Sequence, residues 1–262
     1  FKSLEFSLEK WKKAIKHADS IGIKIFFSVF DKESCDILKK LKISLIKIPS
    51  GEINNYDLLK KINKSGKKVI LSTGMSNLFE IQKALKHLNK CKVILMHCVS
   101  EYPTLKPNLN NIKLLQKKFK LEVGYSDHTP DVITPALSVI AGASYVEKHF
   151  TYNKKQKLGD HKFSLNPGEL RIMMKNVRLA EASKGEERKT ISPKEKKLQF
   201  FARKGLYLIK DKLKGEKIKH SDLIALRPQG YLSVDKMNII KNKKLKIDLR
   251  NLEPLKLNYF RR

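Results

Sequence analysis

The sequence predicts an α/β fold, a (β/α)₈ TIM barrel with about six of its eight βα units present, followed by a small, mostly β domain. Three observations lead to this prediction. Short apolar runs alternate with amphipathic stretches from residue 24 to about residue 150. Polar residues gather at the carboxyl ends of those runs, and the character of the sequence changes near residue 200.

The apolar runs are predicted to be parallel strands, because strands buried on both faces appear as continuous apolar runs. The stretches between them, such as residues 33–42 and 77–88, carry apolar residues at helical spacing. Strands alternating with helices in this way form a parallel sheet. The six runs are KIFFSVF (24–30), SLIKIPS (44–50), KKVILST (67–73), KVILMHC (92–98), LEVGYSD (121–127) and SYVEKHF (144–150).

Serine, threonine, tyrosine, glutamate and histidine residues follow the ends of all six runs. The carboxyl ends of the strands form the catalytic face of a (β/α)₈ barrel. An open doubly wound sheet also binds ligands at its strand ends, but mainly at one crevice. Because every run contributes, the sequence favours a closed ring.

Six strands do not close an eight-stranded barrel, and the chain begins inside a helical pattern with no strand before residue 24. It also begins with Phe1 rather than Met. We therefore expect two N-terminal βα units to be missing. Unpaired parallel strands are prone to aggregate, so we expect this chain alone to be inactive and poorly soluble, and its full-length parent to be active.

The second part of the chain has a different character. A helix is expected over residues 167–185, and a polar stretch follows it. After that come short alternating runs with glycine-containing turns, which are typical of a small β domain. We predict an N-terminally incomplete barrel over residues 1–188, a linker over 189–199 and the small domain over 200–262.

The net charge of +30, from 56 basic and 26 acidic residues, raises the question of nucleic-acid binding. The lysines are scattered along the whole chain, and aromatic residues are not interleaved with them as a stacking surface requires. We therefore expect no nucleic-acid partner. A basic surface does steer anionic substrates inward.

The three cysteines form no CxxC pair, which indicates a reducing compartment and a cytoplasmic protein. No run of about 18 apolar residues occurs, so we expect no membrane-spanning segment.

Six motifs occur in a fixed order: KIPSGE (47–52), LSTGMS (71–76), HCVSEYPT (97–104), GYSDHT (124–129), EKHFT (147–151) and GDHKFSLNP (159–167). On these motifs the chain resembles the N-acetylneuraminate synthase family, which includes the legionaminate and pseudaminate synthases. The C-terminal part resembles the SAF (antifreeze-like) domain of those enzymes.

The resemblance implies a metal-dependent transferase that condenses phosphoenolpyruvate with an N-acetylated aldohexose in its open aldehyde form. The acceptor would be N-acetylmannosamine or a 2,4-diacetamido-trideoxyhexose, and phosphate would leave by C–O cleavage. A divalent metal, Mn²⁺ with Mg²⁺ or Co²⁺ as alternatives, would polarise the aldehyde. HCVSEYPT (97–104) followed by PNLNNI favours the legionaminate type.

The resemblance also implies roles for individual residues. His128 and His149 match the metal ligands. The remaining matches bind phosphoenolpyruvate and its phosphate (Lys47, Ser50, Ser72, Ser126, Ser28 and Ser100) or the sugar (Glu52, Tyr102, Asp160 and Arg227). In the family this arginine reaches the active site of the other subunit, which implies a domain-swapped homodimer. The glycine spacing in RPQGY (227–231) differs from the family's usual pattern.

One departure from the family keeps a second interpretation open. The family carries a glutamate and a Lys-x-Gln on its first two strands, and neither is present in these 262 residues. The alternative is a catalytically dead, truncated relic that acts at most as a sugar-binding module.

Overall fold

The computed structural model describes residues 5–156 and 159–261. The chain divides into two compact units, Phe1–Gly185 and Glu186–Arg262, and each is described here by itself.

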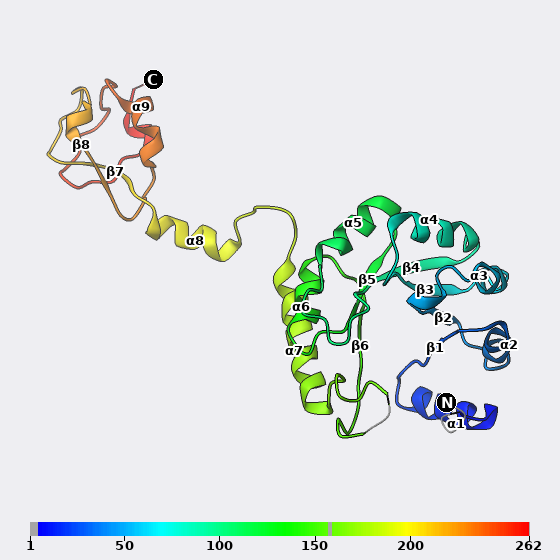
Figure 1. Ribbon diagram of the computed structural model, residues 1–262. Coiled ribbons are helices and arrows are strands. Elements are labelled where there is room, and N and C mark those ends of the chain that lie inside the picture. Colours follow the sequence, from blue (N-terminus) through cyan, green and yellow to red (C-terminus); the bar gives the residue numbers. More distant parts are fainter. Residues whose placement is uncertain (1–4, 157–158, 262) are drawn as a thin grey trace. The chain divides into compact units, whose positions relative to one another are not determined.

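The first unit is built around a six-stranded parallel sheet, in which the strand order follows the chain, β1-β2-β3-β4-β5-β6 (Figure 1). This confirms the predicted α/β fold and the six parallel strands. The strands are β1 (Phe27–Ser28), β2 (Leu45–Ile48), β3 (Lys68–Ser72), β4 (Lys92–His97), β5 (Val123–Asp127) and β6 (Val146–Lys148).

Helices cover the outer side of this curved sheet (Figure 1). They are α1 (Leu8–Ser20), α2 (Lys32–Lys40), α3 (Tyr56–Asn63), α4 (Leu78–His87), α5 (Asn110–Phe119), α6 (Thr134–Ile140) and α7 (Pro167–Lys184). Helices α4 and α7 each begin with a capping box, formed by Asn77 with Glu80 and by Asn166 with Glu169. In this motif two backbone N–H groups that the helix leaves free are satisfied reciprocally.

The two faces of the sheet carry different residues, because successive side chains of a strand point to opposite faces. The outer face joins the large hydrophobic core beneath the helices through Ile46, Val69, Leu71, Val93, Leu95, Val123 and Tyr125. On the inner face a small separate cluster of Ile70, Ile94 and Met96 packs with Leu45 and Tyr145. Two residues further along each of these strands, the inner positions become polar or small.

The second unit has its own core, which includes Leu206, Leu208, Ile218, Leu245 and Phe260. Strands β7 (Gly205–Leu208) and β8 (Leu223–Leu226) form an antiparallel pair, and isolated bridges connect other segments. A short helix, α9 (Met237–Ile240), and several turns account for the rest. Regular strands therefore make up less of this unit than the mostly β prediction expected.

The segment expected to be a linker contains a helix, α8 (Pro193–Ala202). Ser192 accepts a hydrogen bond from the Glu195 backbone N–H, and the Glu195 side chain accepts one from the Ser192 N–H. Pro193 at the first helical position has its backbone angle already set for a helix. None of the helices that the structure describes is long and apolar enough to cross a bilayer.

Replacing Gly124 of β5 by alanine should destabilise the first unit. The added Cβ would overlap the Sδ of Met96 and would lie 2.7 Å from Tyr145 Cβ and 2.9 Å from Tyr145 O. Overpacking of this kind lowers the free energy of unfolding by about 1–3 kcal/mol, measurable by urea denaturation. Gly51→Ala is the control, because no atom lies within 4 Å of a Cβ at that position. Equal loss in both variants would contradict this account of the inner face.

Candidate functional site

The candidate site begins with an ion pair across the inner face of the sheet. The Nζ of Lys47 on β2 lies 2.6 Å from Oε1 of Glu147 on β6. These strands are four positions apart in the sheet order. In a flat sheet they would be about 19 Å apart, because neighbouring strands are spaced by about 4.8 Å. The contact therefore requires the sheet to curve, and it places the inner strand ends around one space.

Ser72 and Ser126 belong to the same inner face, because they lie two residues after Ile70 on β3 and Gly124 on β5. Both are buried, at 3% and 5% exposure. The Ser72 hydroxyl has no hydrogen-bond partner among the described residues. A buried polar group without a partner is costly, and it indicates a bound water or ligand.

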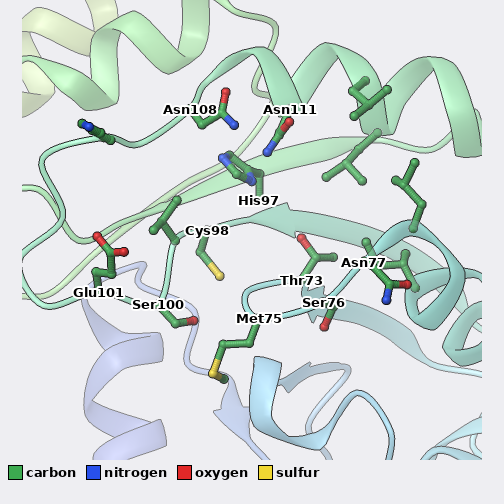
Figure 2. Close-up of a pocket in the computed structure, with 16 residues that line it drawn as sticks. Thr73, Met75, Ser76, Asn77, His97, Cys98, Ser100, Glu101, Asn108 and Asn111 are labelled. Atoms are coloured by element: carbon green, nitrogen blue, oxygen red, sulfur yellow. The ribbon is translucent and has the colours of Figure 1, made fainter.

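The turn after β3 brings two further serines to this rim. A Cβ on Gly74 would overlap the Oγ of Ser100, and it would lie 2.7 Å from Cys98 Sγ and 3.4 Å from Ser50 Cβ. A larger residue at position 74 would push the side chains of Ser100 and Cys98 aside, so glycine favours the close packing of the segment after β4 against this turn. Figure 2 shows Thr73, Met75, Cys98 and Ser100 around this turn.

His128 and His149 follow the ends of β5 and β6, and their ring centroids are 5.5 Å apart. The Nδ1 of His128 lies 2.7 Å from the Val99 carbonyl oxygen. Since a carbonyl only accepts, Nδ1 carries the proton and Nε2 keeps its lone pair. The Nδ1 of His149 lies 3.5 Å from Oδ2 of Asp160. Burial lowers the pKa of His149, which favours the neutral imidazole that ligates metals.

These two imidazoles fit the expected metal as a pair of donors that leaves other positions open. No group of three or more His, Cys, Asp or Glu side chains suited to a metal occurs in residues 5–156 and 159–261. An ion held by His128 and His149 would therefore complete its coordination with water or substrate. Such open coordination is what a catalytic metal needs.

Three of the four residues expected to bind the sugar, Tyr102, Asp160 and Glu52, lie on segments that follow the strand ends. The Tyr102 ring stacks on His128 with centroids 4.1 Å apart, and it meets His149 edge-on at 5.9 Å. Asp160 is exposed and adjoins His149. Glu52 accepts a hydrogen bond of 2.8 Å from Nδ2 of Asn55.

Two expected site residues are not gathered in this way. Ser28 on β1 is the register partner of Lys47, but its side chain is exposed. Arg227 is exposed in the second unit, in the segment after β8. The structure thus brings together the expected residues on β2, β3 and β5 with those on the segments that follow β2, β4, β5 and β6.

Glu147 is a site residue to which the sequence analysis assigned no role. The signal was the alternation in SYVEKHF, which puts Glu147 and His149 on one face and Lys148 on the other. Its pairing with Lys47 could not be deduced, because that contact depends on the curvature of the sheet.

A cavity of about 740 Å³ lies beside the ends of β3 and β4 and shares Cys98 and Ser100 with the rim, and Figure 2 shows the residues that line it. His97 is among them and is buried, with Nε2 donating to the Pro107 carbonyl oxygen at 2.8 Å. His161 is bonded to the Thr151 hydroxyl at 2.7 Å. Both contacts agree with a structural or supporting role for these two histidines.

Comparison with known proteins gives consistent similarities. The NeuB family model matches residues 1–189. An N,N'-diacetyllegionaminic acid synthase of Campylobacter jejuni is 41% identical over 239 residues, which cover 88% of this chain and 71% of that protein. One from Legionella pneumophila is 34% identical over 257 residues, covering 95% of this chain and 72% of that protein.

A similar solved structure is that of a spore coat polysaccharide biosynthesis protein E from Chromobacterium violaceum. It superposes with a TM-score of 0.82 at 26% identity, covering all of this chain and 81% of that one.

The buried His97 should make stability depend on pH. Burial lowers its native pKa, whereas in the unfolded chain the value is about 6.5. Between these two values the unfolded state binds more protons, so the native state loses stability as the pH falls below about 6.5. His97→Gln should therefore show a smaller fall in the free energy of unfolding between about pH 7.5 and about pH 5.5, by urea denaturation. The exposed His220, changed to Gln, is the control. Identical pH slopes in His97→Gln and the unmodified protein would contradict the prediction.

Proposed function

The chain belongs to the NeuB family, and we propose that it is a nonulosonic acid synthase, a transferase that condenses phosphoenolpyruvate with an N-acetylated aldohexose. The observation that carries the proposal is the inner rim, where an ammonium group, buried hydroxyls and two imidazoles face one space. Such a set suits an anionic donor next to a carbonyl acceptor.

Phosphoenolpyruvate occupies the inner part of the rim in this proposal. The ammonium of Lys47, which pairs with Glu147 in this structure, would also donate to the donor's phosphate or carboxylate, and charge-assisted hydrogen bonds to such groups are the strong ones. Ser72 supports this placement, because its buried hydroxyl has no other partner among the described residues. The remaining hydroxyls proposed for the donor are those of Ser50, Ser126, Ser28 and Ser100.

The condensation forms one carbon–carbon bond and breaks one carbon–oxygen bond. The enol C3 of phosphoenolpyruvate attacks the aldehyde carbon, whose oxygen takes up a proton and becomes a hydroxyl. Water adds at C2 and gives up a proton, and the resulting C2 hydroxyl becomes the keto group, with loss of its proton, as the C2–O bond to phosphate breaks. His128 and His149 would hold the divalent metal, which supplies Lewis-acid polarisation of the aldehyde when bound. The chain's own contribution is to hold both substrates in line, and burial lowers the pKa of His149, which favours its neutral form.

The sugar is proposed to lie over the outer rim, against Tyr102, Asp160 and Glu52. A carboxylate accepts paired hydrogen bonds from neighbouring hydroxyls of a polyol. We assign Arg227 to the N-acetyl group of a substrate in the partner subunit of a domain-swapped homodimer. The likeness to two legionaminic acid synthases supports an acceptor of the 2,4-diacetamido-trideoxyhexose type.

The proposal is tested by phosphate release. The purified protein, with the two expected N-terminal βα units included, is incubated with phosphoenolpyruvate, Mn²⁺ and a panel of N-acetylated aldohexoses, with formation of the keto acid as a second readout. We expect release with one diacetamido sugar and loss of release with a chelator or in His128→Gln and His149→Gln. Binding of a sugar with no release for any acceptor would instead favour the catalytically inactive sugar-binding module.

Ser72→Ala separates donor binding from stability. Because the Ser72 hydroxyl bonds to no described residue, its removal should leave the free energy of unfolding unchanged or higher. Affinity for phosphoenolpyruvate should fall about tenfold or more, since a hydrogen bond to a charged group contributes about 1.5–3 kcal/mol.

The matched control for Ser72→Ala is Ser138→Ala. Ser138 is fully buried, and its hydroxyl donates to the Pro135 carbonyl at 2.6 Å. This variant should lose about 1 kcal/mol of stability and bind the donor normally. Unchanged donor affinity in Ser72→Ala would exclude Ser72 from the donor site.

A further inference from the structure

A buried ion pair lies on the opposite face of the sheet from the histidine pair. The Nζ of Lys148 is 2.6 Å from Oδ2 of Asp127, and the two side chains are 3% and 0% exposed. Asp127 and Lys148 are also register partners at the ends of β5 and β6. The pair therefore connects the two strands at the last position before each histidine.

Each oxygen of the Asp127 carboxylate has further donors. Oδ1 accepts from the Tyr125 hydroxyl at 2.8 Å and from the Thr129 backbone N–H at 2.9 Å. Oδ2 accepts from the Thr129 hydroxyl at 3.1 Å in addition to Lys148. Tyr125 belongs to the outer hydrophobic core, so the carboxylate faces away from the substrate side.

The ammonium group of Lys148 forms hydrogen bonds to the residues on both sides of His128. Besides Asp127, it donates to the carbonyl oxygen of Thr129. His128 is the residue between these two contacts, and His149 directly follows Lys148. One ammonium group thus holds the Asp127 side chain before the first histidine and the Thr129 backbone after it, and its own residue directly precedes the second histidine.

A buried ion pair seldom raises stability over an apolar pair of similar volume, because removing two charges from water is costly. The recognised benefit of such a pair is that it fixes one arrangement of the chain. Partners that orient metal-ligating residues typically contribute about 10- to 100-fold in metal affinity.

We infer that Asp127 and Lys148 are positioning residues: together they set the separation and orientation of His128 and His149, without touching substrate. The inference rests on the proposed function in so far as the histidines hold a metal. Its other part, the orientation of the imidazoles, holds for the metal-free protein as well.

Two variants separate positioning from stability. Lys148→Met leaves the Asp127 charge buried without its partner, so the protein should unfold at lower urea concentration. Adding Asp127→Asn removes that charge and keeps an oxygen for Tyr125 and Thr129, so stability should largely recover. Mn²⁺ affinity, measured by titration calorimetry without substrate, should nevertheless be about 10- to 100-fold lower in both variants.

The second readout needs no metal. In ¹⁵N NMR spectra of the metal-free protein, His128 should show a single tautomer with its proton on Nδ1, held by Val99. This signature should be lost in the double variant. Lys61→Met is the control, because it removes an ion pair to Asp36 that has no contact with the histidine segments. It should retain both Mn²⁺ affinity and the tautomer.

The outcomes distinguish this inference from the proposed function. If the unmodified protein binds no Mn²⁺ but the double variant loses the His128 tautomer, the metal assignment fails and the positioning role stands. If the double variant keeps the tautomer and the Mn²⁺ affinity of the unmodified protein, the inference is overturned and the pair is only structural.

Discussion

The curvature of the six-stranded sheet is the constraint on which the rest of the first unit depends. The contact between Lys47 and Glu147 joins side chains from strands four positions apart, and it can form only because the inner face is concave. The same curvature brings the ends of β3 and β5 toward this ion pair. Below it the inner face is apolar, with Ile70, Ile94 and Met96. Toward the carboxyl ends of the strands the inner side chains become polar, as from Ile70 to Ser72 and from Tyr145 to Glu147, two residues further along.

In strand β6 and the residue after it, neighbouring side chains point to opposite faces of the sheet and so have different roles. Glu147 and His149 face inward, where one pairs with Lys47 and the other adjoins Asp160. Lys148, between them, faces outward and pairs with Asp127. A shift of one residue in register would exchange the two faces, burying Glu147 against the outer core and turning Lys148 toward the site. The inter-strand ladder and the site chemistry therefore specify the same register.

The six strands could be predicted because parallel strands covered on both sides leave long apolar runs in the sequence. The edge of the sheet that carries the polar residues followed from their places at the ends of those runs. The pairings of Lys47 with Glu147 and of Lys148 with Asp127 could not be predicted, since they depend on how far the sheet curves. Helix α8 was missed although Ser192 and Glu195 have the spacing of a capping box. The polar character of that segment was given more weight than this local signal.

The close approach of three segments at Gly74 has a consequence for how such a site can diversify. Ser50, Cys98 and Ser100 pack closely around Gly74, so a side chain there would displace Ser100 and Cys98 in the part of the rim assigned to the three-carbon donor. Tyr102, at 47% exposure, and Asp160 have no comparable packing around them. A change of acceptor sugar is therefore accessible through substitutions on the outer rim. A change of donor would have to rearrange the side chains that pack around Gly74.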